Sequence, residues 1–181
     1  MGYFLRPIAN SWLSGRMNGL MLKMVRSDVL HARGERMVAY GNVELLECFE
    51  FNHLSPMNTA LPVFYSSSMD TEAGTMQLKV SSFIPRERMK SLEGSTHFRI
   101  VSIGAVIDFE KGKHKYSEKQ SDLLELGYEE VEAICMDHSL IVERGEVMVL
   151  AMGVLFYKMD EKGNEKIVKG GSMRVVQAGR A

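Results

Sequence analysis

The sequence has few of the residues that carry recognisable chemistry. Cysteine occurs only twice, at Cys48 and Cys135, so we expect no disulfide framework, and both lie in strand-like runs that predict buried free thiols. The five histidines are scattered and lack the HxxxH and HExxH spacings of metal sites. The longest apolar run, residues 147–157, is too short for a membrane-spanning helix. We therefore expect no metal, no cofactor and no membrane span.

No charge sign predominates, and no export signal is evident. The formal net charge is -1, which gives no global attraction to nucleic acid or to an anionic membrane. The N-terminus lacks an apolar run followed by a small-residue cleavage site, so we expect no signal peptide, and localisation is not indicated. Residues 1–36 carry six Lys or Arg against two acidic residues, or +4, which leaves -5 for the remainder. A basic arm can attract its own acidic body or a neighbour's.

An amphipathic segment at residues 5–26 predicts a helix. Leu13, Met17, Leu20, Met21 and Met24 recur at helical spacing and form one apolar stripe. The chain has 14 methionines, and their flexible thioethers suit adaptable contact surfaces rather than a rigid catalytic cavity. This stripe predicts a helix that covers an apolar sheet face.

A second patch lies elsewhere on the same predicted helix. Leu5, Ile8 and Trp12 share one side, and Gly15 and Gly19 continue that side as a shallow notch. Interior glycines each cost about 1 kcal/mol relative to alanine, which favours a close packing partner. A lone GxxxG spacing also fits an irregular helix end, and the pattern does not decide between these interpretations. We predict that these five residues bind a protein partner.

Alternating apolar residues predict a chain of short strands after a polar connection at residues 27–41. Residues 75–81 should have one solvent-exposed face. Residues 96–110 and 147–157 are apolar on both faces, so other parts of the chain must pack on both faces. Residues 85–92 predict one helical turn, and 117–126 predict either a short helix or an irregular crossover. The remaining predicted strands are 43–51, 63–68, 131–136 and 167–177, with hairpin turns at 70–74 and 160–164.

Seven to eight short strands without alternating helices indicate a mainly β protein. We predict an antiparallel β-sandwich, immunoglobulin-like or jelly-roll-like, with one N-terminal amphipathic α-helix. The predicted division is an N-terminal helical arm and connection at residues 1–36 and a β-sandwich domain at residues 37–181. The helix is the natural cover for the outer face of the two doubly apolar strands.

Three stretches carry a family resemblance. They are THFRIVSIGAVIDFE at residues 96–110, GNVELLECFEFN at 41–52 and VLFYKMDEKGNEKIVKGGSMRVV at 154–176. From about residue 4 to near its end, the chain resembles an uncharacterised family of small bacterial β-rich proteins of unknown function. Members carry a glycine-rich β-hairpin before the helix, which this chain lacks. The resemblance implies a compact, self-contained unit and no particular activity or site.

The chemistry-bearing residues do not form a recognisable site. Asp137, His138 and Ser139 are the residue types of a catalytic triad, but triads are assembled from distant segments, so adjacency means little. A surface histidine at a strand end is the simpler interpretation. An enzyme would need a pocket that brings His138 or His97 to a carboxylate. The basic stretch at residues 111–115 is more typical of a solvated turn than of a polyanion site. We predict no catalytic residue and no enzyme activity.

Two functional hypotheses follow. The first is a non-enzymatic structural or assembly module that contacts other protein subunits, most simply further copies of itself, through its N-terminal helix and sheet edges. The second is a ligand-binding β-sandwich, with carbohydrate as the ligand class, in which Tyr65 and Tyr116 supply aromatic contacts. Neither hypothesis involves nucleic acid.

Overall fold

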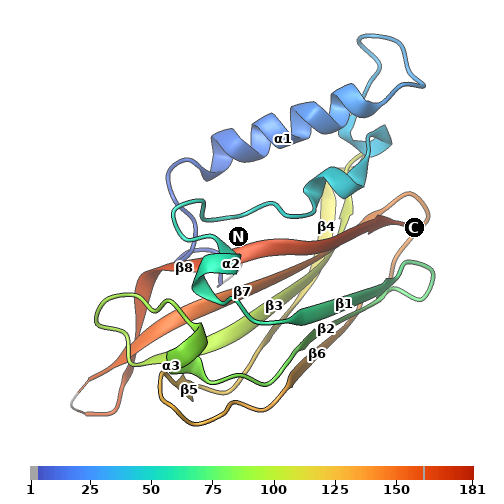
Figure 1. Cartoon of the computed structure of the whole chain (residues 1–181). Helices are drawn as coiled ribbons and strands as arrows, with labels where there is room; N and C mark the ends of the chain where they lie inside the picture. The colour runs from blue at the N-terminus through green and yellow to red at the C-terminus, as the bar shows by residue number, and fades with distance from the viewer. Residues whose placement is uncertain (1–3, 161) are drawn as a thin grey trace.

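Two antiparallel sheets face each other, and a helix lies on the outer side of the larger sheet (Figure 1). The computed structural model describes residues 4–160 and 162–181. The helices are α1 (Leu13–Ser27), α2 (Met57–Ala60) and α3 (Pro85–Arg88), with 3-10 turns η1 (Val38–Tyr40) and η2 (Val43–Leu46). The strands are β1 (Tyr65–Asp70), β2 (Thr75–Val80), β3 (His97–Asp108), β4 (Lys113–Gln120), β5 (Leu124–Glu125), β6 (Ile134–Ser139), β7 (Val147–Met159) and β8 (Glu165–Arg180). The predicted mainly β class with an N-terminal helix is confirmed.

The larger sheet has the order β4-β3-β7-β8, with β5 paired to one end of β3. Its two central strands, β3 and β7, pair in register from His97 opposite Tyr157 to Ile107 opposite Val147. Phe98 and Phe156 are fully buried on the inner face, toward the smaller sheet. Val101 and Leu155 are fully buried on the outer face, so both faces of the central strand pair are covered. This confirms the prediction from the doubly apolar runs.

The smaller sheet has the order β1-β2-β6. On β2, Met76, Leu78 and Val80 are buried while the alternate residues are exposed, as predicted for a strand with one solvent-exposed face. These side chains pack with Phe98, Phe156 and their neighbours in one core between the sheets. The core is thus the space inside the sandwich.

The outer face of the larger sheet is covered by the N-terminal segment and the 3-10 turns more than by α1 itself. Phe4 and Ile8 pack on the outer face of β3 and β7. Farther along the sheet, Met24 of α1 packs with Val43 and Leu46 of η2 against β7 and β8. Within α1 only Leu13 and Met24 are buried. The leading segment therefore forms part of the predicted cover, but most of the helix stands outside it (Figure 1).

Several local predictions differ from the structure. The helix begins at Leu13 rather than at residue 5, because residues 4–8 form turns that press onto the sheet. Residues 43–51 were predicted as a strand, yet Asn42 accepts a hydrogen bond from the Glu44 amide and begins a 3-10 turn. Only Glu50 in that stretch forms an isolated β-bridge, with Arg174. The predicted crossover at 117–126 begins inside strand β4.

Two further predictions concern side-chain burial and a turn. The prediction of buried thiols is wrong, since Cys48 and Cys135 are both free and exposed. Cys48 has a left-handed backbone with φ 64°, which turns its side chain out of the alternating pattern. In the predicted turn at 160–164, Asp160 accepts hydrogen bonds from the amides of Lys162 and Asn164, while Glu161 lies outside the described residues.

Candidate protein interface

One side of α1 is fastened to the body of the protein. Leu13 and Met24 are buried beneath the helix. Arg16 donates a hydrogen bond to the Glu50 carbonyl oxygen, and its guanidinium lies 4.9 Å from the centroid of the Phe49 ring. These contacts fix the rotation of the helix about its axis. The opposite side must therefore face away from the sheet.

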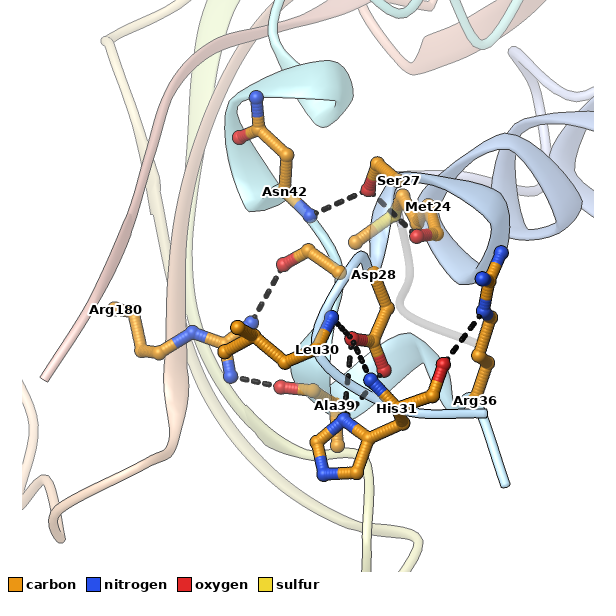
Figure 2. Close-up of polar contacts among 10 residues, drawn as sticks. Met24, Ser27, Asp28, Leu30, His31, Arg36, Ala39, Asn42 and Arg180 are labelled. Atoms are coloured by element: carbon orange, nitrogen blue, oxygen red, sulfur yellow. Dashed lines mark hydrogen bonds and ion pairs between the residues drawn. The ribbon is translucent and has the colours of Figure 1, made fainter. Parts of the chain in front are cut away.

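The C-terminal end of α1 is held by hydrogen bonds between side chains and backbone groups (Figure 2). Ser27 Oγ donates to the Met24 carbonyl oxygen at 2.6 Å and accepts from the Asn42 amide at 2.7 Å. Arg180, at the end of β8, donates to the carbonyl oxygens of Ala39 and Gly41. The last strand thus positions the segment on which the helix end rests.

Beyond the helix, Asp28 organises the next residues (Figure 2). Its side chain is buried and accepts hydrogen bonds from the Leu30 amide at 3.0 Å, the His31 amide at 3.3 Å and His31 Nδ1 at 2.8 Å. Burial raises the pKa of Asp28, but the Leu30 and His31 donors together outweigh it and hold that pKa below its ordinary value. The His31 ring also stacks on Tyr40, with centroids 4.3 Å apart. This loop is fixed by local bonds.

The side of α1 that faces away from the sheet carries an uncovered ridge. Trp12 and Leu22 are 68% and 48% exposed, and they share one helical side with Gly15 and Gly19. Val29 and Leu30, on the fixed loop, are 83% and 89% exposed. We call these residues the exposed ridge: Trp12, Gly15, Gly19, Leu22, Val29 and Leu30. Large apolar side chains that are both exposed and held in place are typical of interfaces.

The structure divides the predicted partner-binding set. Ile8 is only 1% exposed and Leu5 is partly buried, and both pack on the outer face of the larger sheet. Trp12, Gly15 and Gly19 remain exposed. No heavy atom, beyond the helix's own backbone and the neighbouring residues, lies within 4 Å of where a Cβ would be at either glycine, so the described chain leaves the notch open. Their role in binding remains a prediction.

Sequence reasoning missed Leu22, Val29 and Leu30. Leu22 is ten positions after Trp12, which continues the same helical side, so the spacing contained this signal. Val29 and Leu30 are two adjacent aliphatic residues in a polar connection, and Asp28 two positions before Leu30 is typical of an Asx-turn. Their exposure depends on the burial of Asp28, which local spacing does not predict.

The two aromatic residues of the ligand-binding hypothesis lie on different sheets. Tyr65 is on β1, where it is partly buried against the core between the sheets. Tyr116 is on β4 of the larger sheet, is 53% exposed and stacks loosely on His114 at 6.3 Å. The structure therefore does not gather them into one aromatic platform.

His138 is buried, contrary to the prediction of a surface histidine. The alternation of β6 points it between the sheets, where its Nε2 lies 2.8 Å from Ser102 Oγ. Ser102 is 0% exposed, so its hydroxyl is closed to a substrate. Asp137 points to the opposite face and accepts a hydrogen bond from Gln77. The pair is part of the core, and no group of three or more His, Cys, Asp or Glu side chains in the described chain could hold a metal.

The burial of His138 predicts a loss of stability in mild acid. Burial, assisted by the nearby charge of Lys119 and opposed by that of Asp137, lowers the pKa of His138 below its ordinary 6.5. Below pH 6.5 the folded state therefore binds fewer protons than the unfolded state. The free energy of unfolding is at its full value above pH 6.5 and declines as the pH falls below that value. Urea unfolding of the wild type and of His138→Gln at about pH 7.5 and about pH 5.5 measures this. The variant should lose less stability across the interval. Parallel losses in the two proteins would contradict the assignment.

A polar cluster lies at the junction between α1 and β8. A hollow of about 470 Å³ is lined by Arg16, Lys23 and Cys48, among others. Arg174 Nη2 donates to Cys48 Sγ at 2.8 Å, and this contact raises the pKa of Arg174. Burial raises the pKa of Glu50. The hydrogen bond from the Met57 amide and the charges of Arg174 and Arg16 lower it by less. Gly19 also lines this hollow, so the cluster on the fastened side of α1 borders the exposed ridge at that residue.

Comparison with protein-family models and with curated proteins finds no match to this chain. None of the helices in the described part of the chain is long and apolar enough to cross a membrane. The functional argument therefore depends on the geometry of the exposed ridge.

Proposed function

We propose that this protein is a non-enzymatic assembly module that associates with further copies of itself through the exposed ridge. One observation carries the proposal: α1 is fastened to its own sheet on one side, while Val29 and Leu30 are held outward by the Asp28 loop. A mobile loop would lose conformational entropy on binding, whereas a loop already held by hydrogen bonds loses less.

The sheet edges make a secondary contribution to this proposal. The middle of the outer edge of β8 is paired within the chain, because Cys48, Phe49 and Phe51 exchange backbone hydrogen bonds with Met173 and Val175. The edge strand β4 carries three lysines, Lys113, Lys115 and Lys119, which discourage strand addition. The Ser-rich edge of β1 lacks such charges until its last residue, Asp70. Among these edges, β1 is the one suited to a second contact.

Mass measurement over a concentration series tests the proposal. Size-exclusion chromatography with light scattering should show wild-type association that rises with concentration. Leu30→Asp and Trp12→Ala should weaken it, with Leu30→Asp losing at least about 30-fold in affinity, as expected for a central interface residue. Gly15→Ala should also weaken association, because the added methyl group fills the notch, although this change stabilises an isolated helix by about 0.5–1 kcal/mol.

A matched control is available elsewhere on the molecule. Ile141 is 81% exposed and lies in the connection between β6 and β7. Ile141→Asp makes the same kind of change outside the ridge and should leave association intact. A wild type that stays monomeric at every concentration, or a Leu30→Asp variant that associates normally, would contradict the proposal.

A further inference from the structure

Two surfaces of opposite charge lie on different parts of this molecule. Between Lys119 and Arg144 the sequence contains seven acidic residues and no Lys or Arg. In the sequence, Arg26 and Arg33 stand on either side of Val29 and Leu30, and both arginines are exposed. In the described chain, no ion pair satisfies either of these arginines or the exposed carboxylates of Glu129 and Glu130. Both surfaces are free to attract an opposite charge.

The acidic surface contains a hollow that is lined by both acidic and apolar side chains. This hollow has a volume of about 610 Å³ and is formed by residues 121–134, which run from the end of β4 to the start of β6. Leu124, Val131 and Ile134 line it and pack against the core between the sheets. Its acidic lining residues are all exposed, and the 75% exposed Tyr128 lines it too; they are Asp122, Glu125, Glu129, Glu130 and Glu132. We call this feature the acidic hollow.

The chain's own ridge cannot fill its own acidic hollow. Figure 1 shows the loop that follows α1 and the β5 region at opposite ends of the molecule. The loop is also fixed by Asp28 and by the stack of His31 on Tyr40. An occupant with this chemistry must therefore come from another molecule.

We propose that Val29 and Leu30 of one copy dock in the acidic hollow of a second copy. This inference rests on the proposed function, self-association through the exposed ridge. The two aliphatic side chains contact Leu124, Val131 and Ile134, while Arg26 and Arg33 meet the exposed carboxylates of the hollow, Glu129 and Glu130 among them. Apolar contact supplies affinity, and the paired charges supply orientation and speed of association. In the alternative, two ridges face each other, and the exposed Arg26 and Arg33 of one copy then lie near the same arginines of the other copy, which costs electrostatic repulsion.

Such a contact joins different surfaces on the two copies. Because each molecule keeps one free ridge and one free hollow, the assembly continues head to tail, either into an open chain or into a ring. Association should also weaken as salt rises from about 50 mM to about 500 mM, since the charges at the edge are exposed and screened. A contact between two ridges would stop at a dimer.

Charge reversal on each surface, alone and in mixture, tests the inference. Glu129→Lys/Glu130→Lys and Arg26→Glu/Arg33→Glu should each weaken self-association by about 10-fold or more, as measured by light scattering. An equimolar mixture of the two variants restores opposite charges at every contact and should associate again, with masses beyond a dimer. Glu72→Lys/Glu93→Lys changes the net charge as much as the first variant, at exposed positions outside the hollow, and should behave as wild type.

The outcomes separate this inference from the proposed function. If Leu30→Asp is monomeric while Glu129→Lys/Glu130→Lys associates as wild type does, the ridge binds a different surface and the inference is overturned. A mixture that stays as monomeric as its components overturns it too. A wild type that never associates overturns the proposed function itself, and the inference with it.

Discussion

Replacing Gly41 with alanine is expected to lower the unfolding free energy by about 3 kcal/mol and the melting temperature by about 6–12 °C. A Cβ at this position would collide with the carbonyl group and Cα of Met24, at the end of α1. These are backbone atoms held by Ser27, so they cannot move aside as a flexible side chain could. The strain would separate the helix end from η1 and η2 and disturb the contacts of Arg180. Thermal unfolding followed by circular dichroism measures the change.

Gly15→Ala is the matched control for that experiment, because it makes the same substitution where nothing lies within 4 Å of the added atom apart from the helix's own backbone and the neighbouring residues. At low protein concentration it should raise stability by about 0.5–1 kcal/mol through helix propensity. If Gly41→Ala and Gly15→Ala changed stability by the same amount, α1 would not be docked as the structure places it.

Replacing Asp28 with alanine is expected to release the loop that presents Val29 and Leu30. Three donors, the amides of Leu30 and His31 and the His31 ring nitrogen, would lose their common acceptor. Hydrogen exchange at residues 29–36 should become much faster while exchange in β3 and β7 stays slow, because the core between the sheets is not touched. Self-association should weaken by about 10-fold, since the ridge would no longer be held in its binding shape.

The same loop gives a pH dependence with a definite sign. Because the donors hold the pKa of Asp28 below its ordinary 3.8, the carboxylate contributes stability above that pH. The contribution is lost as the pH falls below 3.8 through the lower folded value. Wild-type protection of residues 29–36 should therefore persist to about pH 4 and then decline, and Asp28→Ala should lack this decline. Asp28→Asn keeps one acceptor oxygen and should fall between the two. An Asp28→Ala loop as protected as the wild type would contradict the role given to this carboxylate.

The central part of the fold could be predicted from the sequence because its pattern is strong. The alternation through β3 separates Phe98 and Ile100 from Val101, and the structure places these residues on opposite faces as the period requires. The need for cover on the outer face followed from that separation. The leading segment supplies part of this cover, although as turns at residues 4–8 rather than as a helix.

The failures have local physical causes. Residues 43–51 alternate as a strand does, but the Asn42 cap and the left-handed Cys48 turn the chain into a 3-10 segment. His138 is buried because β6 packs against β3, a pairing of layers that no local pattern contains. The candidate site was predicted only in part. Trp12, Gly15 and Gly19 lie on the exposed ridge, whereas Ile8 is buried against the outer face of the larger sheet.

The central claim is that the fastened helix presents a binding surface on its free side. Hydrogen exchange of the wild type, compared at low and high protein concentration, tests this most directly. The account predicts that residues 12–37 gain protection at high concentration, together with residues 121–134, while β2 and β7 do not change. Equal exchange at both concentrations throughout residues 12–37 would contradict it.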